Sequence, residues 1–127
     1  MLNTITFEGN LAQDPDLSFT ARLGTPVVEL VVLVNRRVRD EHDQWVDATP
    51  TRHRVKAYGH LAEHTAELPK GATVVVVGRV ETDSWEDRES GQTRYADQVV
   101  ADAIGASLRF ATVTITRAPV KPSEDRA

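Results

Sequence analysis

The segment from Thr51 to Gly59 places the strongest constraint on the fold, because its charged and uncharged residues alternate with a period of two. Successive side chains of a β-strand point to opposite faces. One face of this strand carries three cations and an aromatic ring, Arg52, Arg54, Lys56 and Tyr58. The other face is uncharged when the histidine is neutral, and a core can cover it; it holds Thr51, His53, Val55 and Ala57. The charged face suits a polyanion whose bases stack on side chains, although an ordinary half-exposed strand has the same pattern.

The composition is that of one small domain without a membrane segment. The 127 residues include no cysteine, so neither a disulfide framework nor a thiolate zinc site can form. No apolar run approaches the roughly 20 residues that span a bilayer, and the first residues lack the pattern of a secretion signal. We therefore expect a cytoplasmic protein without cofactors and without membrane association.

The net charge of −4 argues mildly against a nucleic-acid partner, but a local patch, not the bulk charge, sets the contact potential. Cations cluster within residues 36 to 56, and the acids of this region lie between them in the sequence. Twelve of the 15 cations are arginine, whose planar fork stacks on bases and grips phosphate. The sequence thus predicts a basic surface on an acidic protein.

Alternating and apolar segments predict further strands before the strand at Thr51–Gly59. Apolar and polar residues alternate over 4–11, where Gly9 indicates a bulge or a sharp bend. Beyond a turn at 14–16, the strand pattern continues over 17–20. Residues 27–35 are nearly all apolar, which predicts a strand covered on both faces.

The remaining segments predict one helix, two strands and two connections. Residues 38–50 hold many charges, which indicates a long, mobile β-loop. Residues 60–68 have helical spacing. Strands are predicted over 73–85 and 95–104, joined by a polar hairpin tip at 86–94.

Three strands, one helix and two strands is the order of an all-β, five-stranded Greek-key barrel of the oligonucleotide/oligosaccharide-binding kind, the OB-fold. The sequence predicts an extra C-terminal strand within residues 108–117, with no partner left in the closed barrel, and an exposed strand edge favours pairing with another subunit. The expected organisation is an OB-fold domain over 1–108, an extra strand for subunit clamping over 109–118, and a short disordered tail over 119–127.

Several short motifs in register resemble the bacterial single-stranded DNA-binding protein family. The motifs are Gly9-Asn10-Leu11 with Asp14-Pro15, His53-Arg54-Val55, Tyr58-Gly59, Leu61-Ala62-Glu63, Lys70-Gly71, Val77-Gly78-Arg79, Trp85 and Tyr95. The resemblance runs from about Asn3 to Leu108. It implies an OB-fold, a homotetramer built as a dimer of dimers, and sequence-independent binding of single-stranded DNA in replication, recombination or repair, with a nucleoid-associated location in the cytoplasm.

The resemblance also implies roles for single residues. Trp85 and Tyr58 match positions at which the family stacks bases. Arg52 and Val38 stand where well-known members have a stacking tryptophan; an arginine can still stack through its guanidinium plane, and Trp45 is the candidate to replace the other ring. The complete predicted DNA-binding set is Arg36, Arg37, Trp45, Arg52, Arg54, Lys56, Tyr58, Arg79, Trp85, Arg88 and Arg94. The predicted subunit interface is Thr4, Thr6, Glu8, His53, Phe110, Val113 and Ile115.

The last residues depart from the family pattern. Family members usually end in a long flexible segment with an acidic, hydrophobic tip that recruits repair and replication enzymes, and residues 121–127 contain no such tip. The chain therefore resembles a short, tail-less, actinobacterial-type paralogue. We expect it to bind DNA without tail-mediated recruitment of repair enzymes.

The sequence also allows two rival functions, a zinc peptidase and an OB-fold module that does not bind single-stranded DNA. His60-Leu61-Ala62-Glu63-His64 matches a zinc-peptidase motif, but five-residue motifs occur by chance, the helix is short and no third ligand stands out. We therefore expect no enzyme and no metal. The alternative function is an OB-fold module that binds RNA or a protein and has no single-stranded DNA function, because a fold alone does not fix a function.

Overall fold

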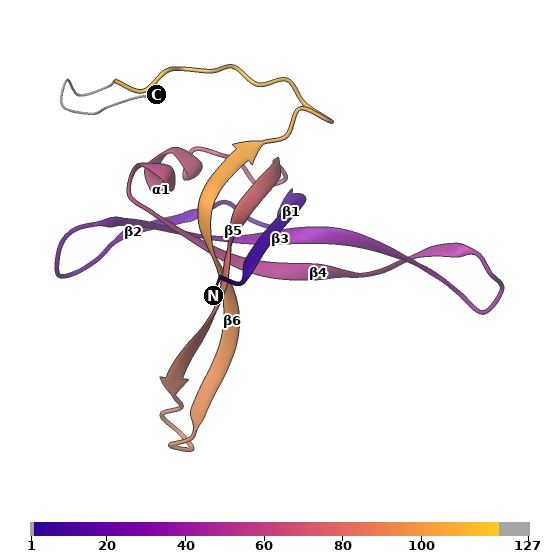
Figure 1. Ribbon diagram of the computed structural model, residues 1–127, viewed down its shortest axis with the longest axis horizontal. Helices are drawn as coiled ribbons and strands as arrows, with labels where there is room; N and C mark the ends of the chain where they lie inside the picture. The colour runs from indigo at the N-terminus through magenta and orange to yellow at the C-terminus, as the bar shows by residue number, and fades with distance from the viewer. Residues whose placement is uncertain (1, 120–127) are drawn as a thin grey trace.

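The computed structural model describes residues 2–119, which form six strands and one helix. The elements are β1 (Thr4–Leu11), β2 (Asp16–Phe19), β3 (Pro26–Arg39), β4 (Trp45–Tyr58), α1 (His60–Thr65), β5 (Thr73–Glu86) and β6 (Thr93–Ala106). The strands follow the order β1-β5-β6-β4-β3-β2, and an additional β1–β3 pairing closes the ring. The predicted all-β fold, a five-stranded barrel with one short helix, is thus confirmed, and β2 extends the sheet outside the ring (Figure 1).

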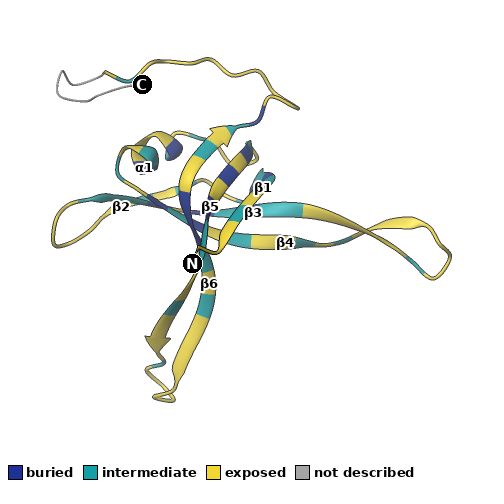
Figure 2. Ribbon diagram, viewed as in Figure 1, coloured by how far each residue is buried: buried dark blue, intermediate teal, exposed yellow. Residues whose placement is uncertain are grey.

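The core consists of the inward side chains of the alternating strands. Leu30 and Val32 of β3, Val55 of β4 and Val76 of β5 are almost completely buried. The short helix α1 adds the buried Ala62 at one end of the barrel. Figure 2 shows that burial is concentrated in this central region. The predicted coverage of both faces of residues 27–35 was wrong, because the alternate face of this strand stays half-buried or exposed in the single chain.

Two glycines let the barrel close by removing a side chain where backbones approach. A Cβ on Gly9 would lie 2.5 Å from the carbonyl oxygen of Leu33, at the point where β1 leaves β5 for β3. A Cβ on Gly78 would collide with the carbonyl oxygen of Val100, next to a register shift between β5 and β6. The bends predicted at both glycines are therefore sites of close backbone contact.

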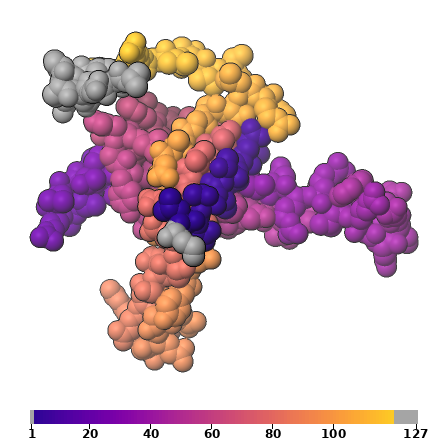
Figure 3. All heavy atoms as spheres, in the orientation of Figure 1, coloured from indigo at the N-terminus to yellow at the C-terminus, as the bar shows by residue number. Residues whose placement is uncertain are grey.

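Two long hairpins leave the barrel as separate arms; the β3–β4 arm corrects the loop predicted over 38–50, whereas the β5–β6 arm agrees with the strands predicted over 73–85 and 95–104. In the β3–β4 arm, residues 36–48, strand pairing continues to Arg39 opposite Trp45, so only 40–44 turn. In the β5–β6 arm, residues 81–97, pairing continues to Glu86 opposite Thr93. Figures 1 and 3 show the two arms projecting from the body in different directions. In the β3–β4 arm Val38 lies opposite Val46, but both stay partly exposed outside the core, so the charge-rich sequence there gave only a weak hydrophobic signal.

The segment after β6 lies outside the barrel. Residues 107–119 form no strand in this single chain, and the upper segment in Figure 1 is this extended stretch. The extra strand over 109–118 was expected to pair with another subunit, so it stays a prediction. Most of the predicted tail, residues 120–127, lies outside the described residues. No helix within residues 2–119 has the length and apolar character needed to cross a membrane.

Candidate nucleic-acid interface

The outer face of β4 carries the predicted basic row. Arg52, Arg54 and Tyr58 are exposed, whereas the alternate residues Val55 and Ala57 are buried. The strand alternation predicted from the sequence is therefore confirmed. The tyrosine ring retains 48% of its accessible surface, which leaves room for a base to stack on it.

The neighbouring strand β3 gives this row an apolar border. Leu33 lies opposite Arg52, and Val31 lies opposite Arg54 in the antiparallel register. Directly opposite residues of an antiparallel pair share a face of the sheet. Arginine guanidinium groups beside half-buried aliphatic side chains form a surface on which a base and its phosphate can both be held.

The cations of the basic row differ in how strongly nearby carboxylates neutralise them. Lys56 Nζ lies 3.4 Å from Glu29 Oε1, and the lysine side chain is only 25% exposed. Arg52 and Arg54 form no ion pair with any residue of the described range. Their charges are the part of the row that is most available to phosphate.

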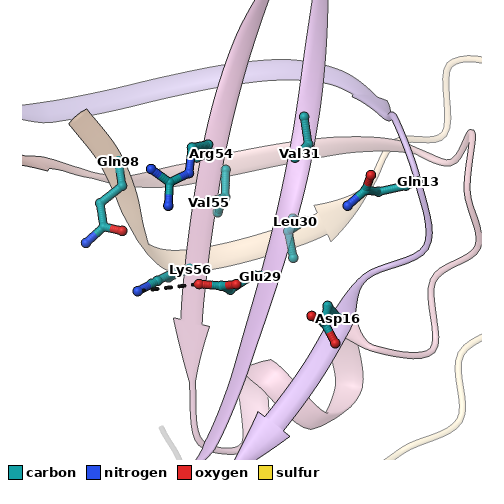
Figure 4. Close-up of a pocket in the computed structure, with 9 residues that line it drawn as sticks. All are labelled: Gln13, Asp16, Glu29, Leu30, Val31, Arg54, Val55, Lys56 and Gln98. Carbon is teal, nitrogen blue, oxygen red and sulfur yellow. Dashed lines mark ion pairs between the residues drawn. The ribbon is translucent and has the colours of Figure 1, made fainter. Parts of the chain in front are cut away.

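Arg54 lines two neighbouring grooves of the barrel surface. One groove lies on the outer surface of β2, β3, β4 and β6, and Figure 4 shows its lining, including Arg54, Lys56 and Gln98. The other groove is shared by Arg52, Arg54 and Gln98 with the apolar Ile5 and Val80. Gln98 lines both grooves, and its Oε1 atom is buried without a hydrogen-bond partner among the described residues.

The β3–β4 arm carries three of the predicted residues. Trp45 is 56% exposed near the turn. Arg37 lies opposite Asp47, with its Nε 3.9 Å from Asp47 Oδ1, and its NH2 donates to the carbonyl oxygen of Trp45 at 3.4 Å. Arg36 NH1 donates to the carbonyl oxygen of Thr49 at 3.5 Å.

The β5–β6 arm carries three more of the predicted DNA-binding residues. Trp85 is 47% exposed and lies directly opposite Arg94. Arg94 NH2 lies 3.1 Å from Asp87 Oδ2, and Arg88 is exposed in the turn. The hydrogen bond from the Glu89 backbone N–H, followed by the bond from Arg94, lowers the pKa of Asp87 below its ordinary value.

Arg79 is placed differently, where β5 runs between β1 and β6. It lies 3.6 Å from Glu81 and 3.8 Å from Asp102, measured between charged atoms. Its Nε atom is buried and has no hydrogen-bond partner among the described residues. Of the predicted cations, it has the most neutralised surroundings.

The structure therefore brings the predicted residues to three places instead of one flat patch. The basic row lies on the barrel, and the two tryptophans lie on separate arms that diverge from the point where β4 meets β6 at Val55 and Lys56. Two further residues join these surfaces without having been in the predicted set. Tyr95 of the β5–β6 arm is 69% exposed, and the guanidinium of Arg39 lies 5.1 Å from the ring centroid of Trp45. A hairpin that pairs Arg39 with Trp45 would have identified Arg39, but the sequence predicts a loop over 38–50.

The predicted interface residues also fall into separate groups. Thr4 and Thr6 are exposed on β1, whose pairing with β3 is limited to Asn10 and Leu11. One edge of β1 pairs with β5, and the opposite edge, which meets β3 only at its end, is unpaired over most of its length in this chain. Phe110, Val113 and Ile115 are exposed in the segment after β6.

His53 and Glu8 make contacts inside the chain as well. The His53 ring stacks on Phe7, with centroids 4.1 Å apart, and burial lowers the pKa of the histidine. Glu8 accepts a hydrogen bond from the Ser107 hydroxyl at 2.7 Å and pairs with Arg109 NH1 at 2.8 Å. The hydrogen bond from Ser107 and then the bond from Arg109 lower the pKa of Glu8. These two residues therefore have roles in the single chain whatever their part in an interface.

The zinc-like motif lies on exposed side chains of α1. The rings of His60 and His64 lie 6.3 Å apart between centroids, and His60 Nδ1 is 3.7 Å from Glu63 Oε1. No group of three or more histidine, cysteine, aspartate or glutamate side chains within residues 2–119 is arranged to hold a metal ion.

The chain is similar to known single-stranded DNA-binding proteins in sequence and in structure. The model of the "Single-strand binding protein family" matches residues 2–107. A single-stranded DNA-binding protein of Mycobacterium leprae is 40% identical over 117 residues, covering 91% of this chain and 68% of that protein. One from Mycobacterium tuberculosis (strain ATCC 25618 / H37Rv) is 39% identical, with 91% and 70% covered. The crystal structure of a small single-stranded DNA-binding protein from Streptomyces coelicolor is 29% identical with a TM-score of 0.67, covering 85% of this chain and 96% of that one.

Proposed function

Because this chain belongs to the single-strand binding protein family, we propose that it binds and protects single-stranded DNA in replication, recombination or repair. The observation that carries the proposal is the outer face of β4, where two unpaired arginines and an exposed tyrosine lie in one row. Cations with exposed rings are the combination that holds single strands without reading their sequence.

In the proposed mechanism, the arginines hold the backbone. Arg52 and Arg54 contact phosphates on the barrel, and Arg36, Arg37 and Arg88 extend the contacts along the arms. Lys56, Arg79 and Arg94 contribute less, because each lies close to a carboxylate, and Arg37 is weakened in the same way by Asp47 at 3.9 Å. Each neutralised phosphate releases counterions, which gives a log–log salt slope of about −0.7 per contact on single strands.

The rings hold the bases. Tyr58 lies at the end of the basic row, while Trp45 and Trp85 offer exposed rings on the two arms. Stacking on an aromatic ring stabilises binding by roughly 1–3 kcal/mol per base, and every base has a π-face. Low sequence preference follows from this mode of contact.

The assembly that we propose is a homotetramer, a dimer of dimers, in the cytoplasm at the nucleoid. The unpaired edge of β1, with Thr4, Thr6 and Glu8, is one candidate contact, because open strand edges favour pairing. His53 and the apolar Phe110, Val113 and Ile115 are further candidates. We expect no catalytic activity.

A binding comparison tests the proposed function. Labelled oligothymidylate, the matching RNA and a DNA duplex of equal length are titrated with the chain in filter-binding assays at several salt concentrations. The proposal predicts that single-stranded DNA binds more tightly than the duplex, with affinity falling as salt rises. Tighter binding of RNA than of DNA, or no binding of either single strand, would contradict it and favour an RNA-binding or protein-interaction module.

A further inference from the structure

The tip of the β3–β4 arm combines a ring, a cation and an acid. Arg39 and Trp45 are directly opposite in the strand register, with the guanidinium carbon 5.1 Å from the ring centroid. Arg39 NH1 is held at 2.9 Å by Oδ1 of Asp43 in the turn. Asp43 has a φ of 59°, in the left-handed region, so the shape of the turn directs its carboxylate.

The tip of the β5–β6 arm holds the same three residue types. Trp85 and Arg94 are directly opposite in the register. Both Nε and NH2 of Arg94 donate to Oδ2 of Asp87, at 3.2 and 3.1 Å. Asp87 begins the turn, where its Oδ1 also accepts the backbone N–H of Glu89 at 2.9 Å. Two hairpins from different parts of the chain thus each place a tryptophan opposite an arginine whose guanidinium pairs with a turn aspartate, although only Arg39 also lies over its ring.

We propose that each arm tip is a grip for one nucleotide, in which the tryptophan stacks the base and the turn aspartate masks the arginine that would hold the phosphate. The inference rests on the proposed function and adds a regulation of affinity to it. Asp43 masks Arg39, and Asp87 masks Arg94. A phosphate must displace the carboxylate before the arginine can contribute to binding.

Competition between two anions for one guanidinium explains why the mask is partial. The paired side chains are substantially exposed, at 58% for Arg39 and 54% for Arg94, so each ion pair is screened by water. An exposed ion pair favours its closed geometry by a factor of up to about five. A phosphate matches the arginine fork and can replace the carboxylate. The freed carboxylate then takes up a cation, which cancels part of the counterion release from the phosphate.

The acid at the second tip remains charged under ordinary conditions. Its pKa is lowered by the Glu89 backbone hydrogen bond and by Arg94, so neutral pH leaves the carboxylate ionised. The mask at this tip therefore acts at neutral pH and is removed by a competing anion or by substitution.

Isosteric amide variants, with matched controls in the same turns, test the mask. Asp43→Asn and Asp87→Asn remove the masking charge; asparagine tolerates a positive φ, and its Oδ1 can still accept the turn hydrogen bond. Glu41→Gln and Glu89→Gln make the same change in net charge. Within the described residues, Glu41 pairs only with His42, and Glu89 forms no ion pair. Binding of labelled oligothymidylate is measured by fluorescence anisotropy over a range of salt concentrations, after circular dichroism has shown that each variant is folded.

We expect each asparagine variant to bind two- to five-fold more tightly than its glutamine control at low salt. Its log–log salt slope should be steeper by up to about 0.7, the value for one added phosphate contact. The gain from Asp43→Asn should disappear in an Arg39→Ala background, because no arginine remains to be unmasked. Asparagine variants that match or bind more weakly than their controls would overturn the mask. The unmodified chain separates the two proposals: if it fails to bind oligothymidylate, the proposed function itself is wrong.

Discussion

Replacing the two unpaired arginines of β4 gives the most informative perturbation of the proposed interface. Arg52→Ala/Arg54→Ala removes two cations that have no acidic partner among the described residues and lie on one exposed face. If each neutralises one phosphate, the log–log salt slope should fall in magnitude by about 1.4. Between about 50 and 200 mM salt, the unmodified chain should therefore lose roughly seven-fold more affinity than the double variant.

A control with the same charge change makes the result interpretable. Arg22 and Lys70 are exposed on turns outside the proposed surface, so Arg22→Ala/Lys70→Ala also removes two cations. Anisotropy titrations of labelled oligothymidylate at five salt concentrations would give the slopes of all three proteins. The reasoning is refuted if the control lowers the slope as much as the β4 variant does, because the contacts would then reflect overall charge and not this strand.

Further predictions concern stacking, packing and pH. Trp85→Ala should weaken oligothymidylate binding by roughly five- to one-hundred-fold with an unchanged salt slope, measured by anisotropy, because a base loses its platform while phosphate contacts remain; a changed slope would argue against stacking. Gly78→Ala should destabilise the fold by about 1–3 kcal/mol in urea unfolding, because its Cβ meets the carbonyl oxygen of Val100. Gly105→Ala, whose Cβ meets nothing within 4 Å, is the control, and equal effects would contradict the packing argument. Burial lowers the pKa of His53 in the fold, so the unfolded chain binds a proton at this residue more readily than the folded chain. The stability of the fold should therefore decrease as the pH drops below about 6.5, and it should decrease less in His53→Phe. Identical pH dependence of the melting curves of the two proteins would refute this.

The barrel could be predicted from the sequence because its strands bury one face in a fixed order. The alternation around Val55 and the apolar run near Val76 report directly which side chains enter the core. Gly9 and Gly78 marked the bends, since backbone contacts there leave no space for a side chain. Burial of apolar surface leaves a periodic record in the sequence, and that record specified the ring of strands.

The β5–β6 arm was predicted as a long pair of strands with a polar tip, but the β3–β4 arm could not be predicted in the same way. In this arm Arg37, Arg39 and Asp47 share one face, and the Val38–Val46 pair on the other face stays partly exposed, so no buried hydrophobic period marks its strands. A charge-rich segment was therefore interpreted as a loop, although the length of two arms decides where Trp45 and Trp85 lie.

The candidate site was only partly accessible from the sequence. Alternation placed Arg52, Arg54 and Tyr58 on one face, and the structure agrees. Ion pairing was not accessible, because partners such as Glu29 for Lys56 are brought together by strand register. Which cations are free and which are neutralised is a property of the fold.

Photocross-linking tests the central claim most directly, that unpaired DNA lies along the outer face of β4 and over the arm rings. An oligothymidylate containing 5-iododeoxyuridine is irradiated with the chain, and the attached peptides are identified by mass spectrometry. The account predicts cross-links at Tyr58, Trp45 and Trp85. Cross-links confined to the exposed Val75 and Val77 of β5, with none on β4 or the arms, would contradict it.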